Sequence, residues 1–228
     1  MNKPRPTVLY HTHQATETRL DILHLAMDIA SAEGLEGLSI GRLATELGMS
    51  KTGIFAHFGS KEELQLATVD SAKEVFIKEV VQPAMATDRG VKRLRVMLDT
   101  WLGYVERVVF RGGCFFAAAS AEFDSRPGRV RDQIAALTKS WLKAIQDEIV
   151  FAQSAGQISS DVDGAQLAFE LHAYVQEANW AFKLFGDKSA FRRASQAIAG
   201  RLSSAAAHRQ HRLGRSRGRA SRNSTLNT

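Results

Sequence analysis

The sequence predicts an all-α fold made of a small N-terminal head and a larger C-terminal helical body. Apolar residues recur at helical spacing along most of the 228 residues, and no segment alternates in the way a half-buried strand does. The helices expected before residue 60 are short and those after it are long, and all three tryptophans lie in the second group. About nine helices account for this pattern.

Each helix of the head has a recognisable start or stop signal. The first is expected over about residues 18–33 and ends at Gly34, because a residue that tolerates positive φ is favoured at a helix C-terminus. The second starts after Ser39 and ends at Gly48, and the third, very short, starts after Ser50. Serine is a preferred N-cap, so both starts are well marked.

The body begins with a fourth helix. Residues 60–63 form a capping-box pattern in which Ser60 caps this helix and Glu63 reaches back, and the helix continues until Pro83. Later helices are expected over residues 88–110, 114–123, 129–155, from Asp161 or Asp163 to 185, and 188–207. We therefore divide the chain into a flexible leader (1–14), the head (15–62), the body (63–207) and a disordered arginine-rich tail (208–228).

The charge of the chain is unevenly placed. The net charge is +6, but the tail holds six arginines and no acidic residue. Removing these six from the 30 basic residues leaves 24, which balances the 24 acidic residues. Bulk charge therefore gives no argument for nucleic-acid binding, which must rest on local arrangement. The tail either adds nonspecific phosphate contacts or is a solvated appendage, and both remain open.

The signals of several other protein classes are missing. One cysteine excludes an internal disulfide, and neither an apolar run of membrane-spanning length nor a secretory signal is present. The sequence also lacks a glycine-rich phosphate loop, a His-Glu-x-x-His pair and a nucleophile elbow. We expect a cytoplasmic protein that is not an enzyme, has no cofactor or metal, and does not bind membranes.

Residues 39–58 carry the most informative pattern, two short helices joined by a tight turn that contains glycine. This fits a helix-turn-helix, whose second helix enters the major groove of DNA. Ser50, Lys51 and Thr52 begin that helix, where free backbone N–H groups favour phosphate, and Lys51 and Thr52 are candidates for base edges. Two short surface helices of a larger bundle would share this spacing, so the pattern alone leaves both interpretations open.

The residues around this motif resemble the DNA-binding domain of TetR/AcrR-type bacterial transcriptional regulators. The resemblance runs from Thr18 to Leu64 and is densest in Leu47-Gly-Met-Ser and in Gly53-Ile-Phe-Ala-His-Phe-Gly-Ser-Lys-Glu-Glu-Leu. It implies phosphate contacts by Ser39, Ser50, His57 and Lys61, base contacts by Lys51 and Thr52, and either kind of contact by Arg42.

Three of these positions have alternatives. The family usually has tyrosine where this chain has Phe55, which either touches a thymine methyl or packs in the core; we favour packing. His57 either contacts phosphate or is a core histidine, and its place just after the recognition helix favours phosphate. Lys61 is either a phosphate contact or a solvated residue, and a cation in the first turn opposes the helix dipole, which suggests that another group holds it.

An effector pocket is expected in the body. Residues 111–132 resemble a C-terminal signature of a large subgroup of the same family, but that signature names no effector. Ligand sites are mostly apolar with a few placed polar groups. The candidates, each with core packing as its alternative, are Trp101, Tyr104, Phe115, Phe116, Trp141, His172, Gln176 and Trp180. They predict a small apolar or aromatic effector.

Cys114 is a further candidate beside this pocket. It follows two glycines at an expected helix N-terminus, where the pKa of a thiol can be lowered. A buried cysteine that behaves as a small hydrophobe is the alternative.

A homodimer is expected because the body has more apolar surface than one bundle can hide. The apolar stripes of the last two helices predict a four-helix interface of two copies, made by Leu171, Tyr174, Ala178, Phe182, Phe185, Phe191, Ile198 and Leu202. The resemblance implies the same mode of dimerisation, whereas intramolecular packing is the alternative. Two heads would read a near-palindromic double-stranded DNA operator.

These expectations predict a sequence-specific DNA-binding transcriptional regulator. The leading hypothesis is a repressor that a small-molecule effector releases from its operator. A transcriptional activator and a nonspecific architectural DNA binder that relies on the tail are the alternatives.

Overall fold

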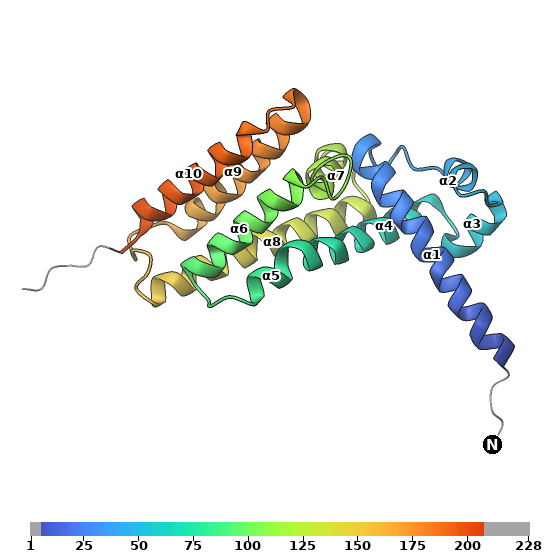
Figure 1. The fold of residues 1–228 in the computed structure, drawn as a ribbon, viewed down its shortest axis with the longest axis horizontal. Helices are drawn as coiled ribbons and strands as arrows, with labels where there is room; N and C mark the ends of the chain where they lie inside the picture. Colours follow the sequence, from blue (N-terminus) through green and yellow to red (C-terminus); the bar gives the residue numbers. More distant parts are fainter. Residues whose placement is uncertain (1–5, 208–228) are drawn as a thin grey trace, which may run out of the picture.

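The computed structural model describes residues 6–207, with side chains from residue 16 onward, and its architecture is all-α (Figure 1). The helices are α1 (Pro6–Glu33), α2 (Ile40–Glu46), α3 (Lys51–Phe58), α4 (Lys61–Phe76), the π-helical segment η1 (Ile77–Val81), α5 (Gln82–Met85), α6 (Val91–Glu106), α7 (Phe115–Phe123), α8 (Arg129–Ser154), α9 (Gly164–Phe185) and α10 (Ser189–Ala205). Because α4, η1 and α5 are continuous, the described residues form nine unbroken helices, which confirms the predicted fold class.

The predicted serine caps are present at the starts of α2, α3 and α4. The hydroxyl oxygens of Ser39, Ser50 and Ser60 accept hydrogen bonds from backbone N–H groups three residues on, at 3.0–3.1 Å. The second half of the capping box is different from the prediction, since the Glu63 carboxylate accepts instead from Arg129 Nη1 of α8 at 2.5 Å. An ion pair to the body thus replaces the local contact.

The N-terminal segment is helical for longer than expected. Within the predicted flexible leader (1–14), α1 already begins at Pro6. Proline is favoured at the first helical position, because its fixed φ suits the helix and its missing N–H would have no partner there. Residues 1–5 and the arginine-rich tail, 208–228, lie outside the described residues.

The fourth helix does not stop at Pro83 as predicted. It widens into η1, where the N–H of Gln82 donates to the carbonyl of Ile77, and then continues to Met85. A proline ring clashes with the carbonyl four residues earlier and offers no N–H, so the chain accommodates Pro83 by a local π register. The Thr100 hydroxyl of α6 lies 3.1 Å from the Val80 carbonyl, although its single proton is nearest the Val96 carbonyl of its own helix, at 2.7 Å.

The other helix ends lie close to their predicted places, with one exception, and the structure also shows which aspartate caps α9. The helix predicted from residue 88 to 110 is shorter, and α6 covers only Val91–Glu106. Asp163 rather than Asp161 caps α9, because its carboxylate accepts from the N–H groups of Ala165 and Gln166. None of the described helices combines the length and the hydrophobicity that a membrane crossing requires.

The head and the body join along α4 and α7. Figure 1 shows α4 leaving the head and running into the bundle of α6, α8, α9 and α10, with α7 beside the end of α1. The Glu122 carboxylate of α7 accepts from the backbone N–H groups of Leu35 and Glu36 at 2.7 and 2.9 Å. A Cβ at Gly34 would lie only 2.7 Å from a Glu122 oxygen, so glycine is what lets the carboxylate approach.

The loop before α7 also contacts the head. The N–H of Gly112 donates to the Ser31 hydroxyl at 3.1 Å, and a Cβ on Gly112 would lie 1.5 Å from the Ser31 carbonyl oxygen. Arg111 Nε pairs with an Asp28 carboxylate oxygen at 2.6 Å. The loop before α7 therefore anchors the C-terminal half of α1 to the body, and Glu122 anchors the segment that follows α1.

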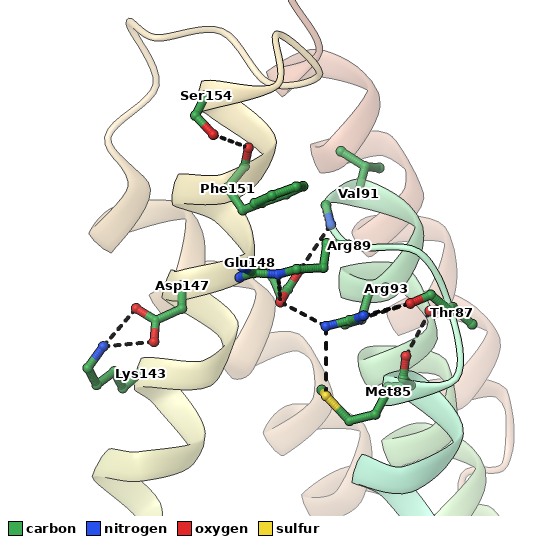
Figure 2. A network of polar contacts seen from close by, with 12 residues as sticks. Met85, Thr87, Arg89, Val91, Arg93, Lys143, Asp147, Glu148, Phe151 and Ser154 are labelled. Carbon is green, nitrogen blue, oxygen red and sulfur yellow. Dashed lines mark hydrogen bonds and ion pairs between the residues drawn. The ribbon is translucent and has the colours of Figure 1, made fainter.

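A buried carboxylate fixes the far end of the body (Figure 2). Glu148 of α8 is 5% exposed and accepts from Arg89 Nε and from the N–H of Gly90, both at 2.9 Å. Arg93 Nη1 lies 3.5 Å from the same carboxylate, and Arg93 also donates to the Thr87 carbonyl. A buried charge is stable only when it is paired and hydrogen-bonded, so this network holds the α5–α6 turn on α8.

Candidate nucleic-acid interface and internal cavity

The helix-turn-helix is built around a small apolar core. Leu43 and Ala44 of α2 and Ile54 and Phe58 of α3 are buried. The turn closes at Gly48, where φ is +64°, and the N–H of Met49 donates to the Ala44 carbonyl at 2.8 Å. These contacts fix the angle between α2 and α3, so the outer face of α3 has a defined direction.

The N-terminal end of α3 is open to solvent. Ser50, Lys51 and Thr52 are all exposed there. The Lys51 side chain lies across the start of α2, where its Cε would be 3.2 Å from a Cβ on Gly41. Helix N-termini present unpaired N–H groups, and these suit phosphate. The three residues predicted for this end are thus available together, and their DNA contacts stay a prediction.

Phe55 lies on the same open face, contrary to the packing that we favoured. Its side chain is 52% exposed, while the neighbouring Ile54 is fully buried. On so short a helix the core takes the positions of Ile54 and Phe58, four residues apart, and Phe55 lies one residue, roughly 100°, round the helix from Ile54. Phe55 therefore stands one turn after Lys51 on the exposed side.

Arg42 is engaged within the head. Its guanidinium donates to Glu33 of α1, with Nη2 to Oε1 at 2.8 Å, and to Glu46 of α2 at 2.7 Å. The hydrogen bond to Glu33, and to a smaller extent the one to Glu46, raises the pKa of Arg42 above its usual value. With two carboxylates beside it, Arg42 is placed as a brace between α1 and α2, and either predicted DNA contact would have to compete with them.

Lys61 and His57 also have partners in the head. Lys61 Nζ donates to the Glu36 carbonyl at 2.8 Å and to its carboxylate at 3.0 Å, which identifies the group that holds this cation. His57 is half-buried, so it is not a core histidine, and its carbonyl accepts from Arg19 Nη1 at 2.5 Å. Arg19 lies 4.3 Å over the Phe58 ring and is a cation near α3 that the sequence analysis missed.

The body contains a cavity of about 230 Å³, partly open to solvent, between α4, α6, α7, α8 and α9. Five of the eight predicted pocket residues line it: Trp101, Phe116, Trp141, His172 and Gln176. Other lining residues, not predicted, come mainly from α4, η1 and α8, and they include Lys73, Phe76, Ile77, Val81, Leu137, Thr138 and Ala144. Lys73, Phe76, Ile77 and Val81 recur at helical spacing, a signal that could have placed α4 beside the pocket.

Phe76 is the centre of the aromatic wall. Its ring packs edge-on against Trp101, Tyr104, Phe116 and Trp141, with centroids 5.0–6.3 Å apart. Such edge-to-face packing fixes the orientation of each ring. The wall is therefore preformed.

Three predicted pocket residues lie elsewhere. Tyr104 and Phe115 are fully buried in the core and do not line the cavity, because the rings around them fill the space. Trp180 is 51% exposed and packs edge-on against Phe185 near the end of α9, away from the cavity lining. The pocket prediction is wrong for these three.

Cys114 lines the cavity but is not an activated thiol. It is 1% exposed, and burial raises the pKa of its thiol. A raised pKa keeps the sulfur protonated and unreactive at neutral pH. The structure therefore favours the interpretation of Cys114 as a small hydrophobe.

The residues predicted for the dimer interface differ in their exposure to solvent. Leu171, Ala178, Phe191, Ile198 and Leu202 are buried within one chain, because α9 and α10 pack on each other and on the rest of the body. Tyr174 and Phe182 are half-buried, and only Phe185 is well exposed. The prediction is therefore wrong for the five buried residues. A different set on α9 is exposed: Phe169, Trp180 and Leu184 beside Phe185.

Family comparisons cover both parts of the chain. Residues 22–68 match the model of bacterial regulatory proteins of the tetR family, and residues 90–198 match the tetracyclin repressor-like C-terminal domain. The chain is also similar to an HTH-type transcriptional regulator of Haemophilus influenzae, with 29% identity over 93 residues. That match spans 40% of this chain and 45% of the relative, so it covers less than half of either.

Solved structures share the fold. A TetR transcriptional regulator from Chloroflexus aurantiacus has a TM-score of 0.79 at 24% identity, over 85% of this chain and 98% of its own. A transcriptional regulator from Saccharomonospora viridis in complex with choline has a TM-score of 0.68 at 21% identity, over 85% and 100%. AibR in complex with isovaleryl coenzyme A and operator DNA has a TM-score of 0.65 at 23% identity, over 82% and 96%.

Proposed function

The chain belongs to the TetR family of bacterial regulatory proteins and is a transcriptional regulator with an N-terminal DNA-binding domain, and from this premise we propose that it is a dimeric repressor released from its operator by a small molecule in the cavity. The operator contacts come from the exposed face of α3, with Lys51, Thr52 and Phe55 toward the bases. Ser39, Ser50, His57 and Lys61 lie toward phosphates.

The observation that carries this proposal is the continuity between the head and the cavity. One unbroken helix, α4 with η1 and α5, starts at Lys61 in the head and contributes Lys73, Phe76 and Ile77 to the cavity wall. At its other connection, α7 supplies Phe116 to the cavity and Glu122 to the head. A displacement of the cavity wall therefore has two direct routes to the orientation of α3.

A second copy is part of the proposal, because one head would read only a half-site. Phe169, Trp180, Leu184 and Phe185 are large apolar residues exposed on α9. Exposed apolar patches of this kind mark interaction surfaces. A twofold dimer through α9 would present two heads to a near-palindromic operator.

Release requires that the effector bind the two arrangements of the heads unequally. A coupling of about 1–3 kcal/mol is typical of allosteric proteins. AibR has been crystallised with isovaleryl coenzyme A and operator DNA, so a protein of this fold can bind both a small molecule and an operator.

The test starts from a selection of genomic DNA fragments by the purified full chain at physiological salt. We expect a near-palindromic consensus sequence. The Thr52→Ala protein should lose its preference for that consensus over other sequences and keep most of its nonspecific affinity for DNA. Lys61→Ala should weaken all sequences alike. Recovery of fragments without a shared sequence would instead support the architectural alternative, and reporter activation from the selected site would support an activator.

A further inference from the structure

We propose that the cavity takes an uncharged, mainly apolar molecule about the size of two fused rings that carries a hydrogen-bond acceptor oxygen such as a ketone or ester. This inference rests on the proposed function insofar as the cavity is the effector site, and it adds the chemical class of the effector. Size, charge and hydrogen-bonding capacity each contribute one part of the argument.

The size of the cavity suits a ligand that is larger than benzene and smaller than a nucleotide cofactor. An apolar protein cavity of about 150 Å³ is known to bind benzene. At about 230 Å³, this cavity has room for a larger ring system, and its aromatic wall is already fixed by the contacts of Phe76. A molecule as large as a nucleotide cofactor exceeds this volume and would have to extend out of the open side of the cavity.

The charges of the lining argue against an ionised ligand. Among the described residues that line the cavity none is acidic, so a cationic ligand would find no carboxylate. The lining cation, Lys73, already has its ammonium 3.2 Å from the Glu74 carboxylate. Burial lowers the pKa of His172, which keeps its ring neutral at physiological pH. An ion moved from water into such a site would lose its hydration without adequate compensation.

The third part of the argument is the hydrogen-bonding capacity of the lining side chains. The indole N–H of Trp141 and the hydroxyl of Thr138, both on lining residues, have no hydrogen-bond partner in the described part of the chain and almost no accessible surface. The indole N–H of Trp101 is equally covered, and its one partner is the Cys114 sulfur. An indole can only donate. Since buried polar groups are normally satisfied, these donors fit a ligand that supplies an oxygen acceptor and toward which the side chains turn slightly when it binds.

Four naphthalene derivatives of nearly equal size test the three parts of the argument. The probes are 2-acetylnaphthalene, 2-ethylnaphthalene, 2-naphthoate and trimethyl(2-naphthyl)ammonium, and their Kd values for the full chain are measured by ligand-observed NMR. We expect the ketone to bind about tenfold or more tightly than the ethyl compound, as the satisfaction of buried donors predicts, and both ions to bind more weakly than the ketone.

Variants test whether the lining tryptophans cause the preference for the ketone over the ethyl compound. Trp141→Phe and Trp101→Phe keep an aromatic ring but remove an N–H, so each should reduce the advantage of the ketone over the ethyl compound while the ethyl compound binds as before. Val150→Ala, at an exposed residue of α8 outside the cavity lining, is the control and should change neither Kd. If the variants fail to fold, the ratio of ketone to ethyl affinity in the unaltered chain still decides.

Each other result overturns the inference. Equal affinity for the ketone and the ethyl compound would show that the donors are not used, tightest binding of naphthoate would point to Lys73, and tightest binding of the ammonium ion would point to cation–π recognition. No binding of any probe would reject the ligand class. DNA-fragment selection on the same sample separates the two hypotheses, because sequence-specific DNA binding without probe binding leaves the proposed function intact.

Discussion

At the scale of single residues, α3 places two large apolar neighbours in opposite environments. Ile54 is fully buried and Phe55 is half exposed. We expect Ile54→Ala to lower the free energy of unfolding by about 2–5 kcal/mol, because it leaves a cavity. Phe55→Ala should change it by less than about 0.5 kcal/mol, since exposed positions tolerate truncation. Urea unfolding monitored by circular dichroism measures both.

The Phe55→Ala variant also tests whether Phe55 takes part in DNA binding. If the exposed ring contacts the operator, Phe55→Ala should weaken operator binding by about fivefold or more, which corresponds to roughly 1 kcal/mol. Unchanged operator affinity in a stable Phe55→Ala protein would remove Phe55 from the interface. The measurement is a fluorescence anisotropy titration with the selected DNA.

Two adjacent acidic residues of α8 give a second matched pair (Figure 2). Glu148 is buried and paired with Arg89 and Arg93, whereas Asp147 is exposed and paired with Lys143. Glu148→Ala should cost about 1–3 kcal/mol of stability, because it leaves the buried Gly90 N–H and the largely buried Arg93 without their partner, whereas Arg89 can turn to water. Asp147→Ala should cost at most about 1 kcal/mol. Similar losses for the two variants in chemical denaturation would contradict this account of the network.

At the scale of the helix, the sequence was most informative where a local rule acts alone. Ser39, Ser50 and Ser60 could be predicted as caps because a serine hydroxyl needs only the N–H groups of its own helix. The orientation of Phe55 could not, because it depends on which positions of α3 the core of the head takes. Glu63 is similar, since its contact with Arg129 depends on where α8 begins relative to α4.

The passage through Pro83 shows another limit of local rules. Proline usually ends a helix, and the sequence analysis ended the fourth helix there. The structure instead inserts η1 and continues the helix, with η1 packed against α6. Whether a helix breaks or widens at proline thus depends on partners from other helices, which the local sequence does not specify.

Helix α7 is expected to couple the cavity to the head through Glu122. Glu122→Gln keeps the shape of the side chain but removes the charge that strengthens its hydrogen bonds to the N–H groups of Leu35 and Glu36. We expect faster amide hydrogen exchange at both residues and a loss of about 1.5–3 kcal/mol in stability. Asp124→Asn, on the exposed turn after α7, is the control and should change neither. Unaltered exchange at Leu35 and Glu36 in Glu122→Gln would show that the contact does not hold the head.

At the scale of the whole molecule, the apolar residues that stay exposed were harder to predict than the residues that begin α3. Apolar stripes on α9 and α10 are visible in the sequence, but they do not reveal which residues the chain itself buries. Leu171, Ile198 and Leu202 are used inside one chain. Phe169, Trp180 and Leu184 recur at i, i+11 and i+15, which places them on one face of α9 that the chain leaves exposed.

This face leads to a prediction about assembly and DNA binding together. Trp180→Glu places a charge in the exposed apolar patch, so we expect a folded monomer where the unaltered chain is a dimer, because an interface core does not tolerate an unpaired charge. Val150→Glu introduces the same charge at an equally exposed apolar residue of α8 and should leave the dimer intact. Size-exclusion chromatography with light scattering distinguishes the two states.

Operator binding should follow the state of assembly. Two linked heads bind a palindrome with an avidity that can exceed that of a single head by about 10²–10⁴. Trp180→Glu should therefore lose most of its affinity for the full operator while it binds an isolated half-site as the unaltered chain does, although Trp180 lies far along the chain from α3. A Trp180→Glu protein that remains dimeric, or a monomer that keeps full operator affinity, would show that this face of α9 does not join the two heads.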